Sequence, residues 1–430
     1  MRHKTMRVWS LLGTGALLLT STACGSSGSS NTTPTNPCDA GLCMNFNPGF
    51  TATTSIPNSI GVTFSGETLG ISGLPFCPAN AGDPYFVDGW SMTFNEYLFV
   101  VANVRLNENP LMDQTWPDMG AQVAMKPGPY VIDAHRAAGF VGKDGVEPAS
   151  GLFLWTQLDN GQAFDTSVRY AFSYDVVQAT YPATGVNLTE AEAADYAMMV
   201  ANGWSKLIRG TATYVGTGTY ANPNDPNAAN AQALFAALPP TVNFAFGWND
   251  ATQMLNCVNY DFSSSEDNLA DRGVQTNPDG TYIAQITEHT DHTFWDKLRQ
   301  EGANLRFDPI AAYGATDGSL FWINNSPQKI ETTFSDASST PLPDRAPYQL
   351  QPECANATPA NQYSNDGTGD GLQVVLNVNG TTGLTDSMPV FMAFSAQSQS
   401  HLNAQGLCYV VGQHANDPYF SPTIQTVPSN

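Results

Sequence analysis

Short alternations of apolar and polar residues, separated by turns, constrain the fold of this chain more than any other feature. Residues 90–95 read Trp-Ser-Met-Thr-Phe-Asn and alternate strictly, and residues 98–106 continue as a second strand. A period of two places every second side chain on one face of a sheet. Gly, at 37 residues, and Pro, at 29, supply turns between such segments. We therefore predict a mainly β fold, a β-sandwich-like body with long loops.

Further segments predict the rest of this body. Strands are expected over residues 131–135, 152–158, 169–177, 211–215, 242–246, 283–288, 373–378 and 390–394. About three inserted short helices are expected as well. One opens on the capping box of Thr189 and Glu192 and runs to about Gly203. The others cover residues 227–237 and a stretch from near Asp291 or Thr293 to about Gln300.

The N-terminus predicts secretion and a lipid anchor. Residues 1–23 have a basic start and a short apolar run, which is typical of a signal peptide rather than a membrane-spanning helix. The run ends in Ser-Thr-Ala before Cys24, which resembles a bacterial lipobox. The position three residues before the lipid-modified cysteine is usually Leu, Val or Ala, and here it is Ser21. Ordinary cleavage that leaves Cys24 free is therefore the alternative. The Gly- and Ser-rich residues 24–37 predict a flexible tether.

These features place the protein at the bacterial outer membrane or in the periplasm, with the membrane as a partner through the lipid on Cys24. Gly25 after the anchor favours outer-membrane sorting. Residues 38–430 are then expected to form a single large β-rich domain. A division into two subdomains near residues 218–240, where Asn, Pro and Asp cluster, is the alternative.

The cysteine content fits an oxidising compartment. The chain has seven cysteines, and six remain once the anchor is set aside. Three disulfides are the natural interpretation, and the sequence alone does not choose the pairing. A thiolate metal site is the weaker alternative, because the chain has no Cys-x-x-Cys pair. The disulfide pool is Cys38, Cys43, Cys77, Cys257, Cys354 and Cys408.

The charge balance excludes one large class of partners. Lys and Arg number 16 against 38 Asp and Glu, a net charge of -22. A chain with so few cations has little to neutralise a row of phosphates, so nucleic-acid binding is not expected. No feature of the sequence identifies a protein partner.

Histidines are scarce, and four of the five that follow the signal peptide lie in suggestive places, the exception being His414 in a polar segment near the C-terminus. His289 and His292 flank Asp291 where a strand is expected to end and a helix to begin. His135 follows Asp133 at the end of another predicted strand, and His401 lies in a late segment. Imidazoles suit copper and zinc. We predict a metal site of His135, His289, His292 and His401, with Asp133 and Asp291 orienting ring nitrogens. The alternative is that these histidines cap turns and bond within loops.

A second, acidic segment could suit a different ion. Asp366 and Asp370 lie in the Gly-rich run Asn-Asp-Gly-Thr-Gly-Asp-Gly, whose oxygen ligands suit calcium. The run lacks the spacing and the terminal Glu of an EF-hand, so a solvated turn is the alternative.

Signatures of common enzymes are missing from the sequence. There is no Gly-x-Ser-x-Gly, no phosphate-binding loop and no His-Glu-x-x-His, because Glu288 precedes His289. Tryptophans could stack on sugars, although packing in the core is the more common role. The tryptophans in question are Trp116, Trp155, Trp204, Trp248, Trp295 and Trp322.

Several segments, in order, resemble a known group of proteins. They are residues 89–90, 129–135, 164–165, 169–172, 285–295 and 400–408. In this order they resemble an uncharacterised family of large lipoproteins from myxobacteria and their relatives, over about residues 70–408. The resemblance implies that the histidine segments are signature pieces of the family. The chain is also similar to the methanobactin-associated periplasmic copper proteins of methanotrophs. This similarity implies that His289, His292 and Trp295 of this chain have parts analogous to the copper-binding residues of those proteins.

The sequence therefore predicts a lipid-anchored cell-envelope protein that binds a transition metal, copper first and zinc second. A surface adhesion or recognition module without metal chemistry is the main alternative. A metal-dependent hydrolase with an open water position is the third hypothesis. Convergence of the histidines in space would favour the first.

Overall fold

The computed structural model of the chain describes most residues from 44 to 216, from 236 to 294 and from 400 to 412. Gaps fall at 48, 79–82, 87, 111–118, 137–138, 144–147, 250 and 263–270. The other described residues are 305, 307, 310–311, 321–323, 375–378 and 381–384. The predicted signal peptide and tether lie outside these ranges, as do the predicted strand at 390–394 and nearly all of the predicted helix at 227–237. Among the described residues, no helix is long and apolar enough to cross a bilayer.

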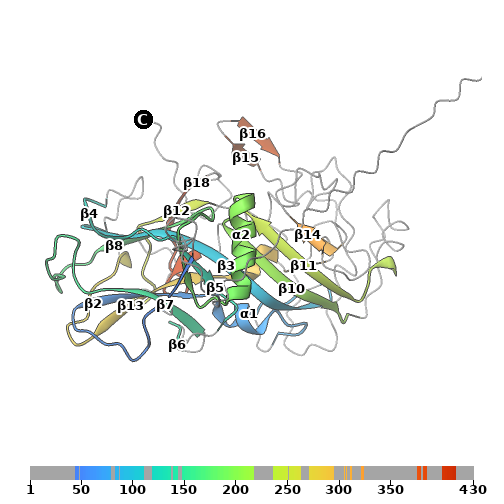
Figure 1. Cartoon of the computed structure of the whole chain (residues 1–430), viewed down its shortest axis with the longest axis horizontal. Helices are drawn as coiled ribbons and strands as arrows, with labels where there is room; N and C mark the ends of the chain where they lie inside the picture. The colour runs from blue at the N-terminus through green and yellow to red at the C-terminus, as the bar shows by residue number, and fades with distance from the viewer. Residues whose placement is uncertain are drawn as a thin grey trace, which may run out of the picture.

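The described strands build two main sheets (Figure 1). The main path of the large sheet is β1 (Met44–Asn47), β9 (Ala183–Val186), β5 (Tyr130–Asp133), β3 (Trp90–Asn107), β10 (Lys206–Tyr214), β11 (Thr241–Trp248) and β14 (Phe321–Ile323). Joined to it are β4 (Gln122–Lys126), β8 (Ala171–Val176), β12 (Thr252–Leu255) and β18 (Tyr409–Gly412). The small sheet runs β17 (Ser400–Leu402), β13 (Thr281–Glu288), β2 (Ser59–Ser65), β7 (Pro148–Trp155) and β6 (Phe140–Val141). A separate hairpin pairs β15 (Val375–Val378) with β16 (Thr381–Leu384).

The two sheets share one hydrophobic core, which confirms the mainly β, sandwich-like prediction. Phe99 of β3 and Phe64 of β2 meet between the sheets, with ring centroids 5.0 Å apart. Both rings are almost fully buried, and Ile286 of β13 joins the same core. Burying side chains of this size contributes roughly 1.5–3 kcal/mol each. The core therefore fixes β13, which leads to the candidate site, against β3.

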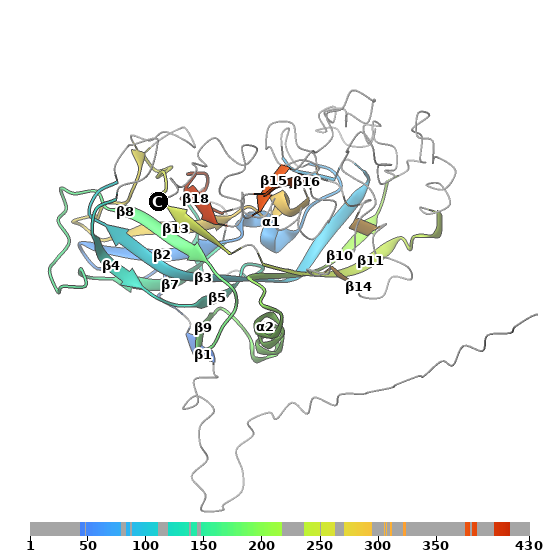
Figure 2. The same ribbon diagram turned by 90° about the horizontal axis from the view of Figure 1, so that it is seen from above.

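The outer face of the large sheet carries a helix. Leu98 and Val100 of β3 alternate with the core residues of the same strand and pack instead with Tyr196 and Met199 of α2 (Glu190–Asn202). The predicted capping box is present, and the Thr189 backbone N–H donates to Glu192 Oε2 at 2.5 Å. Figure 2 shows α2 and the short α1 (Glu67–Ser72) on opposite sides of this sheet.

The prediction of two strands over 90–106 was wrong, because these residues form the single strand β3 of 18 residues. Its register against β10 shifts between Arg209 and Gly210, which pair with Glu96 and Phe94 and leave Asn95 as an extra residue. Before this bulge the even positions face the core, and from Tyr97 to Val101 the odd positions do. A bulge changes the phase of the alternation by one residue, so one strand looks like two in the sequence.

The third predicted helix and the disulfides complete the description of the fold. The predicted third helix begins as the 3-10 helix η3 (Thr290–Phe294), and residues 295–300 lie outside the described ranges. A disulfide joins Cys257 to Cys408 across a sequence separation of 151 residues, and Cys77 is also disulfide-bonded. In the chain-entropy description, closing a loop of this length stabilises the fold by about 5 kcal/mol. The other cysteines of the pool and Cys24 lie outside the described residues.

Candidate metal centre

The end of β13 brings the predicted histidines to one place. β13 ends at Glu288, and the chain turns through His289 into η3, which carries Asp291 and His292. Antiparallel β17 runs beside β13 and places His401 opposite Thr287. The strand ladder therefore determines which side chains can meet in this corner.

Three of these side chains form a compact group. One ligand atom from each of His289, Asp291 and His292 lies within 4.8 Å of the others. Asp291 and His292 are buried, and the His289 side chain is 13% exposed. The rings of His289 and His292 stack with centroids 5.0 Å apart. Asp291, predicted as an orienting group, thus stands among the candidate ligands themselves.

The other two predicted ligands, His401 and His135, differ in how close they come to this group. The His401 ring meets His289 edge to face, with centroids 4.4 Å apart, and lies 6.1 Å from His292. His135 Nδ1 pairs with the Gly70 carbonyl oxygen at 2.9 Å. Gly70 lies in α1, three residues after Glu67. The structure therefore brings His401 beside the group and leaves His135 outside it.

Asp133, the other predicted orienting group, makes its hydrogen bonds to groups other than an imidazole ring. Its carboxylate accepts hydrogen bonds from the backbone N–H groups of Tyr97 and His135 and from Arg136 Nε. Burial raises the pKa of Asp133 to about 6, against the lowering effect of the two backbone donors. These contacts fix the backbone at the end of β5 rather than an imidazole ring.

Both ring nitrogens of His289 face an oxygen acceptor. Nδ1 lies 3.1 Å from Glu67 Oε1, and Nε2 lies 3.0 Å from the carbonyl oxygen of Ala404. Burial lowers the pKa of His289, but the carboxylates of Glu67 and Asp291 and the Ala404 carbonyl outweigh it and raise the pKa to about 10. The metal-free ring is therefore an imidazolium, and a metal ion must displace its proton to bind.

The Ala404 carbonyl is held by a turn with unusual backbone angles. Asn403 and Ala404 have φ values of 53° and 73°, in the left-handed region that non-glycine residues seldom adopt. The Thr287 hydroxyl accepts from the Ala404 N–H at 3.1 Å, and Asn403 Oδ1 accepts from the Gln285 N–H at 2.8 Å. Such strain persists only where surrounding contacts over-determine it.

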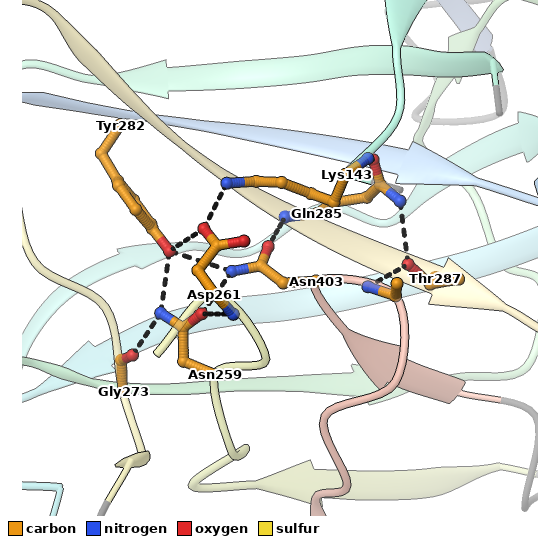
Figure 3. Close-up of polar contacts among 9 residues, drawn as sticks. Lys143, Asn259, Asp261, Gly273, Tyr282, Gln285, Thr287 and Asn403 are labelled. Atoms are coloured by element: carbon orange, nitrogen blue, oxygen red, sulfur yellow. Dashed lines mark hydrogen bonds and ion pairs between the residues drawn. The ribbon is translucent and has the colours of Figure 1, made fainter. Parts of the chain in front are cut away.

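A network of amides and hydroxyls supplies those contacts (Figure 3). Asn403 Nδ2 donates to Asn259 Oδ1 at 2.6 Å and to the Tyr282 hydroxyl at 2.9 Å. That hydroxyl donates to Asp261, which also pairs with Lys143 at 2.5 Å. The network ties the 256–262 loop and the 403–406 turn to β13, so the acceptor of His289 is rigidly placed.

A fully buried ion pair lies directly before the site. Lys206 Nζ of β10 is 2.5 Å from Glu288 Oε1, and neither side chain is exposed. The hydroxyls of Tyr97 and Ser400 donate to the same carboxylate at 3.2 and 2.8 Å. The ammonium also lies 4.5 Å from the ring centroid of Phe99. This pair bridges the two sheets and fixes the residue that precedes His289.

Two partners of His289 were missed by the sequence reasoning, and no pattern in the chain marks either of them. Glu67 comes from α1 and Ala404 contributes only its backbone. Other predicted site residues lie outside the described ranges, namely Trp295, Asp366 and Asp370. Trp155, Trp204 and Trp248 are buried, so their rings do not form a surface for sugars.

Mixed imidazole and carboxylate ligands suit zinc and copper. Comparisons with protein-family models, with curated proteins and with solved structures find no match for this chain. The resemblance to myxobacterial lipoproteins and to the methanotroph copper proteins thus stays a prediction, and function must be argued from the site.

Proposed function

We propose that this protein binds a transition metal ion, copper first and zinc second, through His289, Asp291 and His292, at the bacterial cell envelope under a lipid anchor. The observation that carries the proposal is the approach of three ligand atoms to within 4.8 Å of one another. Two imidazoles and a carboxylate are borderline ligands that both metals accept. Copper comes first because Cu²⁺ binds a given nitrogen and oxygen site more tightly than Zn²⁺.

The surroundings of His289 support the same reading. Metal-binding histidines usually donate the second ring N–H to a carbonyl or carboxylate, which fixes the tautomer. The Ala404 carbonyl has this role toward Nε2 at 3.0 Å, so Nδ1 becomes the ligand atom. The network behind Ala404 then serves to orient the metal ligand.

The direct test is the metal content of the protein purified from the cell envelope without a histidine tag. Elemental mass spectrometry should find near-stoichiometric copper or zinc, after reconstitution if needed. His289→Ala/His292→Ala should lose it while keeping the circular dichroism spectrum. His135→Ala is the matched control, because it removes a histidine outside the group and should keep the metal.

Two results would contradict the proposal. Either the double variant keeps its metal, or the wild-type protein takes up neither Cu²⁺ nor Zn²⁺. The second result would favour the recognition module without metal chemistry. The anchor has its own test, since Cys24→Ser should move the protein from the membrane fraction to the soluble fraction.

A further inference from the structure

We propose that Glu67 is an additional ligand of this metal ion, which would sit between its carboxylate and Nδ1 of His289. The inference rests on the metal function proposed above and names the residue that would close the site. The candidate ligand comes from α1, a segment more than 200 residues away in sequence from η3. The site would then join α1, η3 and the 403–406 turn.

The distance between the two atoms carries the first step. Glu67 Oε1 and His289 Nδ1 are 3.1 Å apart. Ligand atoms about 2.0–2.2 Å from one ion are separated by about 2.8–3.6 Å in octahedral to tetrahedral geometry. The present spacing falls within that range for this pair of atoms. Glu67 lies outside the group whose ligand atoms are within 4.8 Å of one another, so its carboxylate would shift toward Asp291 and His292 as the ion enters. Because Ala404 holds Nε2, it is Nδ1 that faces this position.

The charge of the group carries the second step. Two imidazoles and Asp291 alone would leave a divalent ion with one uncompensated positive charge in a largely buried place. Burying an unpaired charge is costly, and a second carboxylate removes that cost. The Glu67 side chain is 20% exposed, and its Oε1 lies 3.1 Å from His289 Nδ1.

The placement of α1 carries the third step. Glu67 has a φ of 59°, so a non-glycine residue begins this helix in the left-handed region. The Ser65 hydroxyl accepts from the Glu67 N–H at 2.9 Å and holds it there. A Cβ at Gly70 would lie 3.2 Å from the Ala134 carbonyl oxygen and 3.4 Å from Thr290 Cγ2, so glycine lets α1 approach η3 closely. Both partners of His289 thus come from strained backbone, which is common at ligand sites.

The test compares Zn²⁺ affinity by chelator competition and Co²⁺ absorption across four proteins. They are wild type, Glu67→Gln, Glu108→Gln and His292→Ala. Glu67→Gln should weaken Zn²⁺ binding by at least about 10-fold, the lower range for loss of a group that supports a metal. It should also change the Co²⁺ ligand-field bands. Glu108→Gln removes the same charge beside Ala121 and should change affinity less than about 2-fold.

An unchanged or higher Zn²⁺ affinity in Glu67→Gln would overturn the inference. If Glu67 only holds the His289 ring as a counter-ion, its removal frees Nδ1, and Glu67→Gln should bind Zn²⁺ equally or more tightly. If His292→Ala binds like wild type, the metal function itself is wrong, so the two failures are distinguishable. Carbodiimide labelling of wild type gives a readout without a variant. Zn²⁺ should slow labelling at Glu67 and not at Glu108, and equal labelling at Glu67 with and without Zn²⁺ contradicts ligation.

Discussion

Acidic side chains lie on both sides of the large sheet, but their partners differ. On the α1 side, Glu67 and Asp291 meet imidazoles. On the α2 side, Glu192 pairs with Arg136 at 2.6 Å, and Arg209 bridges Glu96 and Asp195. A guanidinium stays protonated and offers no lone pair, whereas an imidazole can exchange its proton for a metal. The α2 cluster can therefore only lock the helix, while the α1 cluster can bind an ion.

The largest effect is expected at the buried pair that supports the α1 side. Lys206→Met leaves the Glu288 carboxylate buried without its cation, which costs about 3–5 kcal/mol of unfolding free energy. Lys206→Met/Glu288→Leu should recover most of that loss, because both charges are then gone. Urea unfolding of the variants and wild type measures this. Equal stability of the single variant and wild type would show that the pair is not a support.

The next effect separates orientation of the ligand from stability. Thr287→Val keeps the shape of the side chain but removes the acceptor of the Ala404 N–H. Leaving that donor unpaired should cost about 1–3 kcal/mol. Metal affinity should fall by about 10-fold, since the carbonyl that fixes His289 loosens. Isothermal titration with Zn²⁺ checks the affinity, and unchanged affinity would remove the 403–406 turn from the account.

On the α2 side, a substitution should lower stability without changing metal affinity. Arg136→Ala removes the partner of Glu192 and Asp133, and its side chain is 40% exposed. The stability loss should be about 1 kcal/mol after solvent screening, with Zn²⁺ affinity unchanged. Thermal unfolding measures the stability loss, and isothermal titration with Zn²⁺ measures the affinity. A fall in affinity as large as that of Thr287→Val would erase the distinction between the two clusters.

The last prediction concerns the pH dependence of stability on the α2 side. Burial, followed by the nearby Asp195 carboxylate, raises the pKa of Glu96 from 4.5 to about 9. The folded state then binds more protons than the unfolded state between these values, so Glu96 lowers stability progressively as pH rises through this window. Glu96→Gln should lessen the loss of stability between about pH 5 and pH 9. Parallel slopes of unfolding free energy against pH would contradict the assignment.

The sequence predicted much of the fold, because strands with one face in the core keep a period of two. The capping box at Thr189 and Glu192 also predicted α2. The bulge at Asn95 could not be predicted, since it depends on how β10 pairs with β3. Local patterns report local structure and say little about a register that another strand imposes.

The candidate site was predictable only where its residues are adjacent in the chain. His289, Asp291 and His292 share one turn and were identified together. His135 was predicted as a ligand because it also ends a strand, yet β5 lies in the other sheet and carries it to α1. Glu67 is one of 38 acids, and nothing local distinguishes it. Only the packing of α1 on η3 gives it a neighbour.

The most direct measurement is the position of the metal itself. Crystals of the mature protein grown with Cu²⁺ would give an anomalous difference map at the copper absorption edge. The account predicts its main peak within about 2.0–2.2 Å of ligand atoms on His289, Asp291 and His292, typical of bonds to such metals. A main peak elsewhere, with none at this group, would contradict it.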